Sequence, residues 1–354
     1  MSGVTEGTRG QFNAPGALER SGLAAVWLFA VAALVLGMVA VGGATRLTGS
    51  GLSITQWRPI SGVVPPMTQA DWLRVFALYR DSAQYRLLNE GMSLRAFQAL
   101  YWWEWGHRLL ARTLGLVFLA PFIGLLAWRR LPPRLLGRCL ILFGLGGLQG
   151  LVGWWMVKSG LEGRTAVLPE RLATHLALAL TLLGALTWTA LEAGFGPVSQ
   201  KRRDGWAMAG LLLMGGLFLQ CLMGALVAGN HAGLIDGDWP LMAGRWFPEG
   251  YWREGLRATF LHGLAAVQFN HRVMAYLLVI AASVTALRAF LGRQTPPAIR
   301  VLATALAVGL WVQAALGVAT LWLSVPLPLA LVHQVNASAM FALSVALAWR
   351  TQRI

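Results

Sequence analysis

Charge and cysteine are both scarce in this sequence of 354 residues. Only 12% of the residues are Asp, Glu, Lys or Arg, whereas 56% are hydrophobic, a balance that excludes an ordinary soluble domain of this length. The two cysteines, Cys139 and Cys221, fall within or at the edge of apolar stretches, which excludes a disulfide between loops and a CxxC motif. We therefore expect both thiols to be buried structural groups.

Acidic residues are the scarcer charge, since 14 Asp and Glu stand against 29 Lys and Arg. Such an excess of cations can indicate a nucleic-acid partner, but these cations form short blocks between apolar stretches, so no nucleic-acid partner is expected. By the positive-inside rule the blocks are cytoplasmic, and the nearly neutral loops between them lie outside. The blocks are Arg129, Arg130, Arg134 and Arg138; Lys201, Arg202 and Arg203; Arg288, Arg293 and Arg300; and Arg350 with Arg353.

Long apolar runs are what the sequence has in abundance. Each is long enough to cross a hydrocarbon core of roughly 30 Å as a helix, so membrane lipid is the expected surrounding. The first run is too long for a signal peptide and follows no cationic cluster, so we expect it to be retained as a span. The predicted fold is an all-α membrane protein of eight transmembrane helices near 22–42, 98–127, 135–157, 172–193, 206–228, 259–287, 299–322 and 328–349.

The chain also repeats itself, with three marks recurring in the same order at nearly one offset. Because four spans return a chain to the same side of the membrane, this order predicts two pseudo-symmetric four-helix bundles in parallel orientation, each with a possible site in its core. The marks are His107-Arg108 and His271-Arg272, 164 residues apart; Gln149 to Gly153 and Gln313 to Gly317, at the same offset; and His175 and His333, 158 residues apart.

This repeat predicts how the chain is organised. Both termini are expected in the cytoplasm, and one long outer loop is expected in the first half. The parts are a cytoplasmic tail at 1–21, an N-terminal half at 22–194 with its outer loop at 45–97, a cytoplasmic linker at 195–205, a C-terminal half at 206–349 and a cytoplasmic tail at 350–354.

Four of the six histidines follow the repeat. His107 and His271 lie on the second span of their halves, and His175 and His333 lie near the start of the fourth. An ionisable side chain inside a membrane is costly unless it is satisfied, which makes such residues functional candidates, although one histidine can simply bond a neighbour. Two facing imidazoles suit the axial positions of haem iron, whereas zinc needs three or four ligands. We therefore predict one haem site in each half.

Two histidines stand outside the repeat. His231 and His262 fall in or beside the second outer loop, near 229–258. We expect both to be solvated loop residues.

Glu104 precedes His107 by three residues, so the two side chains project from nearly the same face of the second span. The matching residue of the second half is Gln268, which means that the carboxylate is not repeated. This asymmetry predicts a catalytic first half and a cofactor-holding second half. The alternative is an interfacial glutamate paired with Arg108 or Arg112.

Arg108 and Arg272 directly follow the paired histidines. A guanidinium binds carboxylates through two parallel hydrogen bonds, so both arginines are candidates to bind haem propionates. Snorkelling of the two side chains to the membrane interface is the alternative.

Five stretches together resemble the haem A synthases, membrane enzymes that convert haem O to haem A for cytochrome oxidase. They span nearly the whole chain, and the closest similarity is to the proteobacterial and mitochondrial branch, which implies a bacterial inner (plasma) membrane. The stretches are GGATRLTGSGLSITQW at 42–57, WEWGHR at 103–108, THL at 174–176, VQFNHR at 267–272 and HQ at 333–334.

The resemblance implies a role for each candidate residue. His271 and His333 would ligate haem B as a cofactor, and His107 and His175 would serve the iron of the substrate, haem O. Glu104 matches the essential glutamate of the family. The implied reaction oxidises the C8 methyl of haem O through hydroxymethyl and hydrated-aldehyde stages to a formyl group. The implied partners are an electron acceptor of unknown identity and the haem O synthase that supplies the substrate.

The sequence departs from the family pattern in its outer loops. Gln56 stands where many members carry Glu, Asn230-His231 interrupts the usual loop, and Leu261-His262 replaces a common Glu-Asn. The loop cysteine pair of some bacterial members is absent, which excludes a thiol-based role in these loops.

Two other classes of protein share some of these features. A dihaem b-type membrane cytochrome that only transfers electrons would have both histidine pairs but no need for an unrepeated Glu104. A transporter that uses buried histidines as proton relays would also show a two-fold repeat in the membrane.

Overall fold

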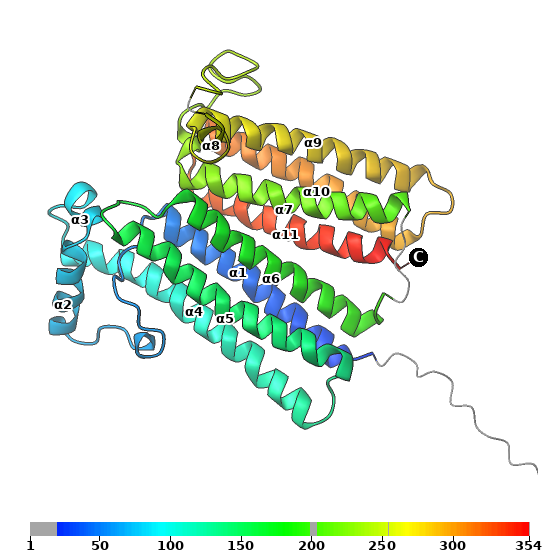
Figure 1. Cartoon of the computed structure of the whole chain (residues 1–354), viewed down its shortest axis with the longest axis horizontal. Coiled ribbons are helices and arrows are strands. Elements are labelled where there is room, and N and C mark those ends of the chain that lie inside the picture. Colours follow the sequence, from blue (N-terminus) through cyan, green and yellow to red (C-terminus); the bar gives the residue numbers. More distant parts are fainter. Residues whose placement is uncertain (1–19, 199–203, 254, 354) are drawn as a thin grey trace, which may run out of the picture.

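A computed structural model describes residues 20–198, 204–253 and 255–353, which are helical apart from loops and one β-bridge between Met242 and Arg245. Eight of the described helices are long and apolar enough to cross a membrane, and they run side by side (Figure 1). The predicted all-α membrane fold is therefore confirmed. The eight are α1 Gly22–Leu47, α4 Leu94–Ala127, α5 Pro133–Leu161, α6 Pro169–Phe195, α7 Gly205–Gly229, α9 Leu264–Leu291, α10 Pro297–Trp322 and α11 Leu327–Thr351.

The helices begin where local chemistry favours it. The side chains of Ser21, Ser93 and Asp204 accept hydrogen bonds from the first turns of α1, α4 and α7. The helices α5, α6, α10 and α11 carry proline in the first turn, where its missing N–H costs no helical hydrogen bond. The span predicted at 259–287 was placed wrongly at its start, because residues Gly255–Leu261 form a separate helix, α8.

The two parts of the chain pack their helices in related ways, but α10 packs closely on α9 whereas α5 touches α4 only slightly. In the first part α1 packs against α4 and α6, and α5 packs against α6; in the second part α7 packs against α9 and α11, and α10 packs against both of these. Contacts of α6 with α7 and α11, and of α1 with α11, join the two parts around one continuous apolar core. Gln334 of α11 strengthens this junction by donating a hydrogen bond to the carbonyl of Val39 in α1 at 2.9 Å.

The basic loops gather at one end of the bundle. The α4–α5 loop, the α9–α10 loop, the start of α1 and the end of α11 lie at the right-hand end in Figure 1. The predicted tail at 1–21 falls mostly outside the described residues, and Lys201 to Arg203 of the predicted linker fall outside them entirely.

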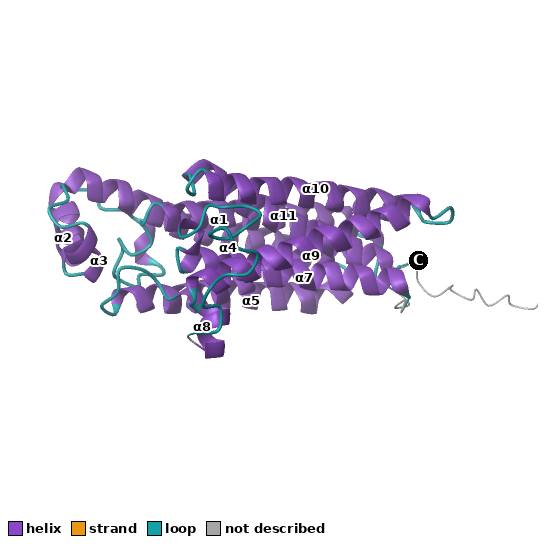
Figure 2. Cartoon of the chain, turned by 90° about the horizontal axis from the view of Figure 1, so that it is seen from above, coloured by secondary structure: helices purple, strands orange, loops and turns teal. Residues whose placement is uncertain are grey.

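The opposite end carries a helical cap that was not predicted. The long loop after α1 contains a 3₁₀ turn, η1 Ser61–Val63, and two helices, α2 Gln69–Arg80 and α3 Ala83–Leu88 (Figures 1 and 2). With 34 residues, α4 is about 50 Å long and exceeds a hydrocarbon core of roughly 30 Å. Its first turns project beyond the other helices, and α2 and α3 pack on them.

Aromatic side chains hold this cap together. Its buried members are Trp72, Tyr79, Tyr85, Phe97 and Tyr101. The Tyr79 hydroxyl donates to the side-chain carbonyl of Gln84 and accepts from the Asn89 amide, and burial raises the pKa of Tyr79 above its ordinary value. The second outer loop is smaller and contains η2 Ala232–Leu234 besides α8.

Candidate functional site

The four repeated histidines meet in two pairs. His107 of α4 lies near His175 of α6, and His271 of α9 lies near His333 of α11. All four residues are half-buried, and three of them lie in the first two turns of their helices at the capped end. The structure thus brings together the residues that the repeat associates.

Each imidazole packs against a glycine of the neighbouring helix. A Cβ added at any of the four glycines would lie within 3.2 Å of a ring atom, which is tighter than ordinary van der Waals contact. Because glycine has no side chain, each imidazole can pack directly against the backbone of the neighbouring helix. The contacts are Gly42 of α1 with His107 (3.2 Å), Gly153 of α5 with His175 (2.9 Å), Gly224 of α7 with His271 (3.2 Å) and Gly317 of α10 with His333 (3.0 Å).

A glutamine amide reaches three of the four histidines from the same neighbouring helices. In each case the amide nitrogen donates to the backbone carbonyl of the histidine and lies within 3.4 Å of a ring nitrogen. These amides fix where each histidine sits along its helix. The pairs are Gln149 with His175, Gln220 with His271 and Gln313 with His333.

The donor atoms fit a haem in each half. Among the described side chains, the buried Nδ1 atoms of His175 and His333 have no hydrogen-bond partner, which is unusual for buried polar atoms and suits rings whose bonding a ligand would complete. No group of three or more His, Cys, Asp and Glu side chains in the described ranges is arranged to hold a metal ion. Two imidazoles per half match the axial ligands of haem iron.

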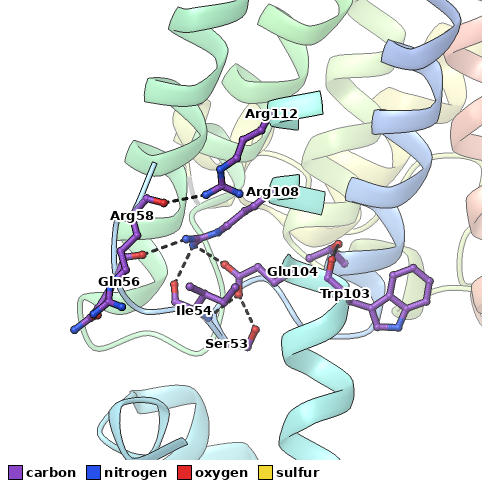
Figure 3. Close-up of polar contacts among 9 residues, drawn as sticks. Ser53, Ile54, Gln56, Arg58, Trp103, Glu104, Arg108 and Arg112 are labelled. Atoms are coloured by element: carbon purple, nitrogen blue, oxygen red, sulfur yellow. Dashed lines mark hydrogen bonds and ion pairs between the residues drawn. The ribbon is translucent and has the colours of Figure 1, made fainter. Parts of the chain in front are cut away.

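Glu104 of α4 points toward the loop that follows α1, where Ser53 and Ile54 lie beside it (Figure 3). Only 3% of its surface is exposed, and its carboxylate accepts hydrogen bonds from the Ser53 hydroxyl and the Ile54 N–H, both at 2.8 Å. Arg108 forms an ion pair with the other carboxylate oxygen at 2.7 Å. In the described part of the chain, no hydrogen bond joins Glu104 to His107.

The ion pair considered as the alternative for Glu104 is therefore present, with the carboxylate buried rather than solvated. Arg108 also donates to the backbone carbonyls of Ile54 and Gln56, at 2.9 and 3.2 Å. One turn further along α4, Arg112 donates to the carbonyls of Arg58 and Pro59 (Figure 3). The two arginines tie the loop after α1 to α4.

In the second half, α9 binds the loop that follows α7 much as α4 binds the loop that follows α1. The difference is that Gln268 donates hydrogen bonds to its loop, whereas Glu104 accepts them. Gln268 donates to the carbonyls of Ala232 and Asp236, both at 3.0 Å, and accepts from Arg272 at 3.1 Å. The first loop presents an O–H and an N–H to Glu104, whereas the second presents two carbonyls to Gln268. The acid at position 104 therefore matches a loop that presents hydrogen-bond donors, and the amide at position 268 matches a loop that presents acceptors. The sequence did not reveal this structural reason for the difference.

Arg272 completes the same arrangement in the second half. It is 7% exposed and donates to the carbonyls of Asp236, Asp238 and Leu241 at 3.2, 2.7 and 2.9 Å. Such burial is incompatible with snorkelling of this side chain. A propionate contact by Arg108 or Arg272 stays a prediction, and the contacts that the structure contains are with the loops.

Tryptophans pair at the outer end of each half. The rings of Trp57 and Trp154 lie 5.1 Å apart, with the Arg108 guanidinium over Trp154 at 5.8 Å, and those of Trp239 and Trp322 lie 6.4 Å apart. Trp57 and Trp239 are 182 residues apart in the sequence, as are Gly42 and Gly224. The helix α1 and the loop after it thus correspond to α7 and its loop at an offset of 182 residues, which differs from the offsets between the histidines. The sequence analysis missed this offset, and it also missed Gln220.

The remaining histidines and the cysteines lie apart from the two pairs. His231 is exposed after α7, as expected, whereas His262 is half-buried with its Nε2 3.9 Å from a Glu170 carboxylate oxygen. Cys139 and Cys221 are buried free thiols, as predicted.

Known proteins match this chain over almost its whole length. A family model described as cytochrome oxidase assembly protein matches residues 25–345. The chain is 51% identical to the haem A synthase of Caulobacter vibrioides over 335 residues, which cover 95% of this chain and 98% of that protein. It is 48% identical to the haem A synthase of Methylobacterium radiotolerans, over 92% and 89% of the two chains, and 46% identical to that of Paracoccus denitrificans, over 90% and 85%.

Proposed function

The chain belongs to the family of cytochrome oxidase assembly proteins, and on that premise we propose that it is a haem A synthase. It is an integral membrane enzyme that oxidises the C8 methyl of haem O to the formyl group of haem A. The structural observation that carries this function is the meeting of two imidazoles in each half, each ring seated on a glycine. A dihaem cytochrome would share the pairs, but the relatives matched over the whole chain carry the name of the synthase.

The two haems are assigned to different halves, which are taken as duplicates of one four-helix bundle. His271 and His333 hold haem B in the C-terminal half, where Gln220 contacts the ring of His271 and Gln313 contacts the ring of His333. His107 and His175 serve the iron of haem O in the N-terminal half, which carries a buried carboxylate, Glu104, three residues before a site histidine.

Haem, when bound, supplies the redox chemistry, and the chain supplies position, exclusion of water and proton transfer. The imidazoles orient the porphyrins, and the Trp57–Trp154 pair with its loop covers the outer end of the first half. The Glu104 carboxylate accepts a proton released from the reacting methyl, or stabilises positive charge that develops on that carbon. Its hydrogen bonds from Ser53 and Ile54 keep it in place for this role.

The reaction also defines the partners. Conversion of a methyl to a formyl group removes four electrons and adds one oxygen atom, so an electron acceptor and a source of that oxygen, water or dioxygen, are required besides haem O. A haem O synthase that delivers the substrate is the second expected partner, and both would meet the enzyme within the lipid.

The function is tested by identifying the haems that the purified protein carries. Extraction and mass spectrometry should detect haem B together with haem O, haem A or the hydroxymethyl intermediate. The double variant His107→Ala, His175→Ala should keep haem B and lose the other haems, because only the first site is removed. Haem B alone in the parent protein, from cells that make haem O, would instead identify an electron-transferring cytochrome.

The orientation in the inner membrane is a further part of the proposal. Both termini and the Arg129 to Arg138 block face the cytoplasm, because basic loops are retained on that side. In spheroplasts a membrane-impermeant maleimide should label Met67→Cys, at an outer residue that is 75% exposed, and should label Arg130→Cys only after lysis. The native thiols are buried and serve as a silent background. Labelling of Arg130→Cys in intact spheroplasts would reverse the orientation.

A further inference from the structure

Three of the four site histidines accept a hydrogen bond from a glutamine side chain, whereas the described contacts give His107 no such partner. Gln149, Gln220 and Gln313 each stand one turn before the glycine on which their histidine rests. On α1 the residue one turn before Gly42 is Met38, which is half-buried and therefore lies on the face that His107 contacts. Met38 and Gln220 are 182 residues apart, the same offset as Gly42 and Gly224, so they occupy equivalent places.

A glutamine and a methionine do different things beside an imidazole. The amide both donates and accepts, whereas a thioether donates nothing and adapts its shape to its surroundings. Each glutamine spans the backbone carbonyl and the ring edge of one histidine, which fixes both. His107 has the packing against Gly42 but no such amide among the described contacts.

The three glutamine amides are not equally fixed. In the second half the Gln313 carbonyl accepts from Asn336 at 2.8 Å, which locks the amide with its nitrogen towards His333. The residue equivalent to Asn336 in the first half, at an offset of 158, is Leu178, which cannot donate. The Gln149 carbonyl is accordingly buried without a partner, and so is the Gln220 carbonyl, so that of the three amides only that of Gln313 is locked in this way.

We propose that these amides distinguish a permanent haem site from an exchangeable one. Gln220 and Gln313 are positioning residues that hold both ligands of haem B, and Met38 leaves His107 as the ligand that a substrate haem binds and releases. A cofactor must stay through many turnovers, whereas haem O must enter and haem A must leave at each turnover. This inference rests on the proposed assignment of haem B to the C-terminal half.

The test is a reciprocal exchange of the two equivalent residues in the haem-loaded enzyme. Gln220→Met and Met38→Gln are purified in detergent and mixed with excess apomyoglobin, and the haem that is transferred is followed by its spectrum and identified by mass. Loss of an outer-shell partner costs about 10–100-fold in affinity at metal sites, so Gln220→Met should release haem B at least about tenfold faster. Met38→Gln should slow the release of haem O and haem A by a similar factor and leave haem B unchanged.

Two controls separate positioning from folding. Leu219→Met places the same side chain one residue away, at a position that is 48% exposed, and should leave haem release at the parental rate. Gln149→Met should affect only the haem of the first half. The low-spin signal of haem B in electron paramagnetic resonance should shift in Gln220→Met and in neither control, because only that variant frees a haem B ligand to rotate.

The outcomes also separate this inference from the proposed function. If His271→Ala removes haem B but both exchanges leave release within about twofold of the parent, the haem assignment stands and the positioning role is wrong. If His271→Ala retains haem B, the assignment itself is wrong. Should Gln220→Met fail to fold, Met38→Gln still decides, because it places an amide at a half-buried position and removes no hydrogen bond found among the described residues.

Discussion

Replacing His271 or His333 with Ala should lower the haem B content of the purified enzyme below about a tenth of the parental level. Under the proposed assignment each ring would supply one of the two protein ligands of the haem iron, and losing a ligand costs more than the about 10–100-fold in affinity that an outer-shell partner contributes. Neither substitution should unfold the chain, since both residues are only half-buried and sit beside glycines. The measurement is haem extracted per protein, together with the reduced and oxidised spectra.

Two matched variants make this result specific. His231→Ala removes an exposed loop histidine and should keep all haem B, and His107→Ala should keep haem B while disturbing the other site. An unchanged low-spin spectrum in both His271→Ala and His333→Ala would place haem B elsewhere in the protein.

Glu104→Gln should lower haem A formation by about 10²–10⁴-fold, the usual effect of losing a general acid or base, while haem B content stays near parental. The structure adds a second effect of this substitution. The carboxylate accepts from Ser53, Ile54 and Arg108, whereas an amide has only one oxygen, so at least one buried donor is left unsatisfied at a cost of about 1–3 kcal/mol. Loss of activity alone would therefore not separate chemistry from loop structure.

Ser53→Ala provides that separation. It removes one donor to Glu104 but keeps the carboxylate, so it should loosen the loop and reduce haem A formation by no more than a few fold. Haem A and its intermediates are measured in membranes of strains that carry each variant alone. Normal haem A levels in Glu104→Gln would show that Glu104 only forms a structural ion pair. An equally large defect in Ser53→Ala would show that Glu104 affects the reaction only through the structure of the loop.

The membrane helices could be predicted because each needs only length and apolarity, both of which a sequence displays directly. The cap helices could not be predicted in this way, since α2 and α3 are short and lie in a polar loop. One local signal was present: Thr68 and Asp71 form a capping box at the start of α2, with each side chain bonded to the other's backbone N–H.

The histidine pairs could be predicted from the repeat, but their surroundings could not. Gln220 was missed because α1 and α7 are related at an offset of 182, whereas the histidines that the sequence analysis compared are related at 164 and 158. The contacts of Arg108 and Arg272 with the loops were missed for a different reason. They end on backbone carbonyls, which every residue carries and no sequence pattern reveals.

The consecutive residues Gly42 and Gly43 of α1 pack against side chains in both halves of the protein. Being consecutive on α1, they face different helices: a Cβ at Gly42 would meet the His107 ring, and one at Gly43 would lie 2.5 Å from the side-chain oxygen of Gln334, the neighbour of His333. Gly37, in contrast, has nothing within 4 Å of such an atom. Substitutions at Gly37 should therefore be tolerated during evolution, whereas any side chain gained at Gly42 or Gly43 would displace His107 of one histidine pair or Gln334, the residue beside the other pair.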